Sequence, residues 1–148
     1  MEGLPKSNSG VIVDLLVFVS EQWLLVSMLA VLVSALIVVE RKRAGLQLNS
    51  NEATRMINSD KAVIVDLRES KDFSSGHIVD AVNIPFAKLS DRAVELEKHK
   101  TKTLILVDKM GQHTGAGVKT LTALGYDCAR LQGGMMEWQN QNLPLVKG

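Results

Sequence analysis

An uncharged run of 18 residues, QWLLVSMLAVLVSALIVV at positions 22–39, constrains this chain more than any other feature. A helix rises about 1.5 Å per residue, so a helix of this length covers roughly 27 Å, close to the hydrocarbon thickness of a bilayer. A buried helix of a globular core is the competing interpretation, and an unbroken apolar run of this length disfavours it. The run predicts a transmembrane helix over residues 22–39 that has the lipid bilayer as its partner.

The charges that flank this run predict its direction. Residues 40–45 begin Glu-Arg-Lys-Arg and form a basic juxtamembrane linker, whereas Lys6 is the single basic residue before the run. Because basic residues concentrate on the cytoplasmic side, we expect the N-terminus outside and the C-terminal part in the cytoplasm. A cleaved signal peptide would carry its positive charge before the apolar core and a small-residue cleavage site after it, which this sequence lacks.

Residues 1–21 form an N-terminal apolar or interfacial segment. Positions 11–20 are apolar apart from Asp14, and Glu21 follows seven residues later, so a helix would carry both carboxylates on one face. Such a helix fits either the outer membrane interface or an extension of the spanning helix. The sequence leaves both arrangements open.

Charge and cysteine content exclude several classes of function. The chain has 17 basic and 16 acidic residues, so net charge gives no support to nucleic-acid binding. Its single cysteine, Cys128, excludes an internal disulfide and a multi-cysteine metal site. The three histidines show no ligand spacing, and we expect neither a metal nor a cofactor.

The rest of the chain alternates between predicted strands and helices. A capping-box-like pair, Asn49 and Glu52, predicts a helix to about Asn58. Short apolar segments predict strands, and amphipathic segments between them predict helices. The strands are expected at 62–67, 81–84, 103–107 and 128–131, with 44–49 a connection or a first strand. The helices are expected at 90–100, at 114–124 and from the Gly133-Gly134 turn to the residue before Pro144, with 72–76 a short helix or a turn.

This alternation predicts an α/β fold with a mostly parallel sheet flanked by helices. In such sheets ligands bind beyond the carboxyl ends of the strands. Asp66 and Arg68 follow one predicted strand, and the loop 108–113 follows another, so both are expected at that edge.

Two motifs resemble the rhodanese family. DLRESKDFSSGHIVDAVNIP at 66–85 is similar to the rhodanese signature D-x-R-x-x-x-x-F-x-x-G-H-I-x-x-A-x-N-I-P, and LQGGMMEWQNQNLPL at 131–145 is similar to the family's C-terminal motif. The resemblance covers residues 46–146 and implies a rhodanese-like domain behind a bacterial inner-membrane anchor. It also implies structural polar contacts for Asp66, Arg68 and His77.

The resemblance also implies a catalytic loop, which is degenerate here. In rhodaneses a six-residue loop begins with the cysteine that carries sulfane sulfur, and an arginine often ends it. This chain keeps the loop length but reads Asp108, Lys109, Met110, Gly111, Gln112 and His113. A carboxylate cannot carry a transferable sulfur, because that chemistry needs a polarisable thiolate. It can accept the loop N–H groups, which would make the loop a structural element without catalytic residues.

The leading hypothesis is a non-catalytic docking or adaptor domain at the cytoplasmic face of the inner membrane, where proximity alone suggests a membrane protein as a partner. The alternative is a sulfurtransferase that uses Cys128 or a cysteine of a partner. Cys128 lies in a predicted strand away from the loop, where a lone cysteine usually acts as a small buried hydrophobe. A third interpretation is a module that binds a small anion in the loop. The sequence does not indicate the partner or the oligomeric state.

Overall fold

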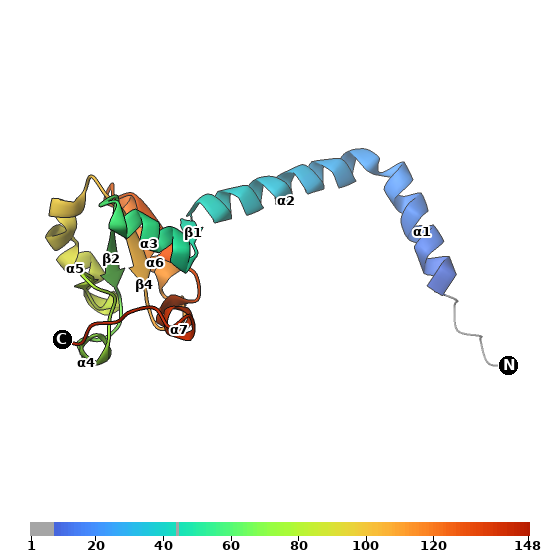
Figure 1. Ribbon diagram of the computed structural model, residues 1–148. Helices are drawn as coiled ribbons and strands as arrows, with labels where there is room; N and C mark the ends of the chain where they lie inside the picture. Colours follow the sequence, from blue (N-terminus) through green and yellow to red (C-terminus); the bar gives the residue numbers. More distant parts are fainter. Residues whose placement is uncertain (1–7, 44) are drawn as a thin grey trace. The chain divides into compact units, whose positions relative to one another are not determined.

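The computed structural model describes residues 8–43 and 45–148, which divide into a helical unit up to Glu40 and a domain from Arg41. The expected N-terminal segment and linker therefore fall partly on residues 1–7 and 44, outside the described residues. Figure 1 shows the elements along the chain. The α-helices are α1 Asn8–Glu21, α2 Trp23–Arg43, α3 Ser50–Asn58, α4 Ser70–Ser75, α5 Leu89–Arg92, α6 Thr114–Ala123 and α7 Gly134–Asn140. The strands are β1 Leu46–Leu48, β2 Ala62–Asp66, β3 Val82–Asn83, β4 Thr103–Val107 and β5 Cys128–Leu131, and 3-10 turns cover η1 Phe86–Lys88 and η2 Ala93–His99.

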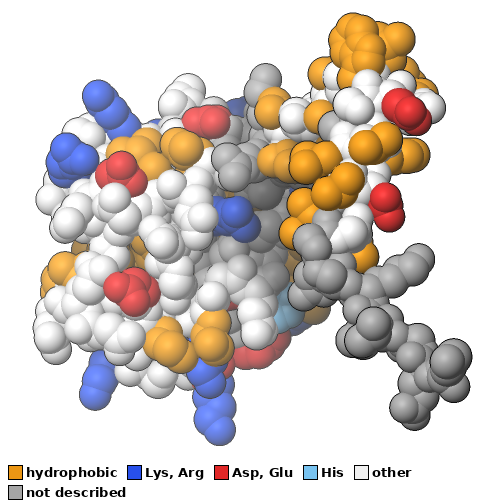
Figure 2. All heavy atoms as spheres, turned by 90° about the vertical axis from the view of Figure 1, so that its right-hand side faces the viewer, with side chains coloured by type: hydrophobic (Ala, Val, Ile, Leu, Met, Phe, Trp, Pro, Cys, Tyr) orange, Lys and Arg blue, Asp and Glu red, His pale blue; other side chains and the backbone are white. Residues whose placement is uncertain are grey.

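The helical unit exposes its apolar side chains. Among the exposed large hydrophobic residues of α1 and α2, the exposed fraction ranges from 43% at Val39 to 71% at Met28. Figure 2 shows such side chains gathered along this segment, with acidic side chains among them. Among the described residues, no single helix is long and apolar enough to cross a membrane. By length and composition only, a membrane span could be formed by two segments that a bend separates, Gly10–Phe18 and Trp23–Val39.

The domain is built on a five-stranded sheet in the order β1-β5-β4-β2-β3, and every recorded strand pair is parallel. This confirms the predicted α/β fold with a parallel sheet. β1 resolves the alternative that the sequence left open at 44–49, since Leu46–Leu48 pairs with β5. The cap predicted for α3 is also present, because the Asn49 side chain accepts from the Glu52 N–H and the Glu52 carboxylate accepts from the Asn49 N–H.

Helices cover both faces of the sheet (Figure 1). Side chains alternate along β4, so that Leu104 and Leu106 join one apolar cluster and Ile105 and Val107 join the other. The first cluster includes residues of α5, η2 and α6, and the second includes residues of α3 and α7. A strand buried on both faces reads as a continuous apolar run, which is why β4 was predicted so well.

One predicted helix is wrong in its form. The continuous helix expected at 90–100 is a single α-helical turn, α5, followed by the 3-10 segment η2. The Tyr126 hydroxyl donates to the Ala93 carbonyl at 2.9 Å, so a partner distant in sequence occupies a carbonyl that a regular α-helix would bond internally. Smaller differences affect α4, which begins at Ser70 rather than at position 72, and β3, which is shortened to Val82–Asn83.

Candidate functional site at the carboxyl edge of the sheet

The ends of β2 and β4 bring the two sequence-predicted groups of polar residues together. Asp66 and Val107 are register partners at the ends of these parallel strands, and the Leu67 N–H donates to the Val107 carbonyl at 2.8 Å. The chain then leaves each strand at the same edge of the sheet. The segment after Asp66 and the loop that begins at Asp108 therefore lie side by side, as predicted.

A buried ion pair holds the segment after β2. The Asp66 carboxylate is fully buried and accepts from Nε and Nη2 of Arg68, the second at 2.6 Å. Arg68 Nη2 also donates to the Gly76 carbonyl at 2.8 Å, which ties the start of the segment to the end of α4. The Asn83 amide adds two more bonds, to the carbonyls of Asp66 and Arg68. The structural roles expected for Asp66 and Arg68 are thus confirmed.

The Asp108 carboxylate occupies the centre of its own loop. Its Oδ1 accepts from the Gly111 N–H, and its Oδ2 accepts from the His113 N–H at 2.8 Å. Asp108 is buried, and Gly111 adopts a φ of +89°, which a residue with a Cβ rarely adopts. The prediction that Asp108 accepts loop N–H groups is confirmed, and two donors that could otherwise face an anion are bonded within the protein.

The N-terminus of α7 forms hydrogen bonds to the backbone of this loop, and the sequence analysis did not predict these bonds. The Met135 N–H donates to the Asp108 carbonyl at 2.8 Å, and the Met136 N–H donates to the Lys109 carbonyl at 3.1 Å. Gly134 allows this approach: a Cβ there would lie 2.6 Å from the Asp108 carbonyl oxygen and 3.0 Å from the Gly111 nitrogen. The Gly133-Gly134 pair was predicted only as a turn. The signal available in the sequence was a second consecutive glycine, which a simple turn does not need.

A pocket of about 360 Å³ opens beside the loop. Its wall includes the Asp108 and His113 side chains, and Phe86 packs against His113 with ring centroids 5.1 Å apart. Met110 at the loop tip is exposed, as is Lys109. The remaining wall carries both signs of charge and contains Leu67, Arg68, Glu69, Asp72, Ala87, Lys109, Met110 and Gln112. Within the part of the chain that the structure describes, no group of three His, Cys, Asp or Glu side chains could hold a metal.

Cys128 lies far from the loop. It begins β5 and is the register partner of Leu104, four residues before Asp108, which corresponds to about 13 Å along the strand. Its thiol is buried and contacts the Tyr126 carbonyl at 3.7 Å. Burial raises the pKa of the thiol to about 11. The interpretation of Cys128 as a buried hydrophobe away from the loop is confirmed.

Cys128 is therefore expected to react slowly with iodoacetamide. With a pKa of about 11, only about 0.1% of the thiol is ionised at pH 8, whereas an unfolded cysteine with a pKa near 8.5 is ionised to about a quarter. Alkylation of the folded chain at pH 8 should be at least about 100-fold slower than alkylation in urea. Mass spectrometry of timed samples measures both rates, and similar rates would contradict the burial of the thiol.

The same shift predicts how stability changes with pH. Because folding raises the Cys128 pKa, the folded state binds the proton more tightly, and this contribution is complete below the unfolded pKa. It is lost as the pH rises from the unfolded value of about 8.5 to the folded value of about 11. The unfolding free energy of the parent chain should fall more steeply over this interval than that of Cys128→Ser, in parallel urea titrations.

Comparisons with known proteins agree with this architecture. A family model described as "Rhodanese-like domain" matches residues 49–141. The protein YibN of Escherichia coli K12 is 42% identical over 99 residues, which cover 66% of this chain and 69% of YibN. A rhodanese-related protein of Thermoplasma volcanium has a similar fold, with a TM-score of 0.64 and 24% identity over 70% of this chain and 99% of that one. A thiosulfate sulfurtransferase of Pseudomonas aeruginosa gives a TM-score of 0.65 and 24% identity over 75% of this chain but only 22% of its own length.

Proposed function

Because the chain belongs to the rhodanese-like domain family, we propose that it is a membrane-anchored member whose domain docks a partner protein instead of transferring sulfur. The observation that carries this proposal is the Asp108 carboxylate with its bonds from the Gly111 and His113 N–H groups. By its resemblance to the family, Asp108 stands where the sulfur-carrying cysteine would begin the loop. A carboxylate there accepts the donors that would stabilise a thiolate or a persulfide, and it repels anionic sulfur donors.

The membrane part of the proposal is supported by the exposure of the apolar residues in α1 and α2. In water, a continuous apolar surface of this extent needs a cover, and the hydrocarbon of a bilayer provides one. The basic residues at 41–43 then favour a cytoplasmic domain with the N-terminus on the periplasmic side. In this arrangement the domain meets membrane proteins by proximity, and we propose a partner of that class.

The enzyme alternative requires a thiol that can reach the loop. Cys128 is the only cysteine of the chain, and it lies at the amino end of β5, whereas the loop follows the carboxyl end of β4. The pKa of its thiol is also raised. A thiol with these properties does not accept sulfane sulfur efficiently, since the thiolate is the nucleophile. The geometry therefore favours the docking function over catalysis by Cys128.

The full-length chain in detergent is expected to show no thiosulfate:cyanide sulfurtransfer above a buffer control. Asp108→Cys supplies a thiol at the loop, although His113 still ends the loop where family members often have arginine. The assay should include Cys128→Ser, which removes the only thiol of the parent. Robust turnover that Cys128→Ser abolishes would refute the docking function in favour of catalysis. Turnover that appears only when a cysteine-containing membrane extract is added would favour a partner cysteine instead.

Reporter fusions test the proposed orientation. A reporter that is active only in the cytoplasm should be active when fused after Gly148, and one that is active only in the periplasm should be silent there. Changing residues 41–43 to glutamines provides a matched control, because it removes the positive charge and leaves the apolar run intact. Activity of the periplasmic reporter on the parent chain would overturn the orientation.

A further inference from the structure

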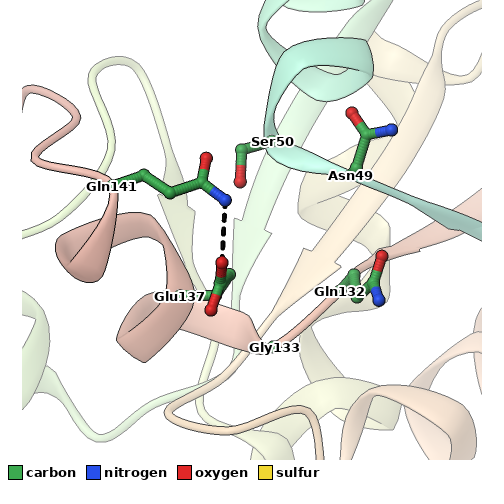
Figure 3. A pocket seen from close by; sticks show the side chains of 6 residues that line it. All are labelled: Asn49, Ser50, Gln132, Gly133, Glu137 and Gln141. Carbon is green, nitrogen blue, oxygen red and sulfur yellow. Dashed lines mark hydrogen bonds between the residues drawn. The ribbon is translucent and has the colours of Figure 1, made fainter.

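A second pocket lies at the same edge of the sheet but beside other strands. It has a volume of about 300 Å³, at the lower end of the range for small-molecule sites. Its wall comes from the residues that follow β1 and β5 and from α7: Asn49, Ser50, Gln132, Gly133, Glu137 and Gln141 (Figure 3). Because neighbouring parallel strands end here, the location is one where α/β proteins bind ligands.

The Ser50 hydroxyl distinguishes this pocket from an ordinary surface depression. Ser50 is only 3% exposed, and its Oγ has no hydrogen-bond partner among the described residues. Figure 3 shows this Oγ pointing into the space between the labelled side chains, while the Asn49 amide turns away from it to cap α3. A buried hydroxyl without a partner costs free energy, and a ligand group in the pocket would satisfy it.

The charge of the lining selects the kind of ligand. Among the described residues that line the pocket, Glu137 is the one with a formal charge, and one of its oxygens accepts from the Gln141 amide at 2.8 Å. Its second oxygen, the Gln141 carbonyl oxygen and the Ser50 hydroxyl remain as acceptors. The helix ends near the pocket already have carboxylates of their own, Glu52 in α3 and Glu137 in α7, so an anion gains little there.

We propose that this pocket binds a guanidinium or ammonium group through Glu137, Ser50 and Gln141. Such a group offers several N–H donors at once and neutralises the Glu137 carboxylate, which makes its hydrogen bonds charge-assisted. The cation belongs either to a free small molecule or to an arginine side chain of a partner segment. This site does not depend on the proposed docking function, because it lies on residues outside the Asp108 loop and its pocket.

The test uses N-methylguanidinium and its neutral counterpart N-methylurea, which has a similar shape. Each is titrated into the ¹⁵N-labelled full-length chain in detergent, and the amide signals of Ser50, Gly133 and the Gln141 side chain are followed. N-methylguanidinium should shift these signals saturably and bind about tenfold more tightly than N-methylurea. Equal affinity, or shifts that do not saturate, would overturn the proposal and leave a pocket that holds only solvent.

Three variants locate the interaction. Glu137→Gln keeps the size of the side chain and removes its charge, so it should weaken N-methylguanidinium about tenfold and leave N-methylurea unchanged. Ser50→Ala should weaken both probes. Glu97→Gln is the matched control, since Glu97 is an exposed carboxylate on η2 that does not line the pocket. Unchanged binding to Glu137→Gln, or an equal loss in Glu97→Gln, would overturn the proposal.

A capped Gly-Arg-Gly tripeptide then identifies the source of the cation. Affinity equal to that of N-methylguanidinium supports an arginine side chain carried by a partner segment. Affinity about tenfold lower supports a free small cation, because a chain on both sides of the arginine would not fit the pocket.

Discussion

Asp66→Asn is expected to lower the unfolding free energy of the domain by about 3–5 kcal/mol, the cost of leaving one partner of a buried ion pair alone. Asp66 is fully buried, and the Arg68 side chain is only 8% exposed. Replacing the carboxylate by an amide keeps its shape but leaves the guanidinium charge without compensation. Urea unfolding of the full-length chain, followed by Trp138 fluorescence in a Trp23→Phe background, measures the loss.

The double variant Asp66→Asn, Arg68→Met provides the control for this prediction. It removes the uncompensated charge, so it should be more stable than Asp66→Asn alone even though it contains one more substitution. Arg68 also donates to the Gly76 carbonyl, so recovery to the parent value is not expected. A double variant less stable than Asp66→Asn would show that charge compensation is not the dominant interaction of this pair.

Asp108→Ala is expected to cost about 1–3 kcal/mol, because it leaves the N–H groups of Gly111 and His113 without their acceptor. The vacated loop then presents these donors to solution, so sulfate should bind the variant and stabilise it more than the parent. Thermal unfolding of the parent and the variant, with and without sulfate at constant ionic strength, measures both effects.

The control for Asp108 is Asp91→Ala, which removes an exposed carboxylate on α5. It should change stability little and leave the response to sulfate equal to that of the parent. If Asp108→Ala behaves like Asp91→Ala, Asp108 is a dispensable loop residue. In that case the interpretation that the Asp108 carboxylate fills the anion site of its own loop is wrong, and the proposed function loses the observation that carries it.

Local sequence signals predicted much of the domain. The Asn49–Glu52 cap, the strands at 103–107 and 128–131 and the position of the Asp108 loop all follow from short-range patterns. Each depends on residues within a few positions of one another, such as a side chain bonding an N–H three residues away or a short apolar run between turns. The hydrogen bonds of Asp108 within its loop could be predicted for the same reason, since Asp108 and its donors lie within six residues.

Contacts between residues far apart in the sequence could not be predicted from local patterns. The 3-10 form of η2 accompanies the bond from Tyr126 to Ala93, 33 residues apart, and no pattern within 90–100 shows it. The prediction of a regular α-helix at 90–100 is wrong because a tertiary hydrogen bond competes there with the hydrogen bonds within the helix. The support of the Asp108 loop by α7 likewise joins residues more than 20 positions apart.

The sequence by itself determined which residues occupy the degenerate loop, that Cys128 is the only thiol, and that an apolar run precedes an α/β domain of the rhodanese-like family. The tertiary structure alone decided that Gly134 must lack a Cβ beside Asp108, and that the end of β1 meets α7 around the buried Ser50 hydroxyl. The physical reason is the range of the interactions. Backbone caps and apolar periodicity act between near neighbours, whereas close packing and pockets depend on which distant segments the parallel sheet brings together.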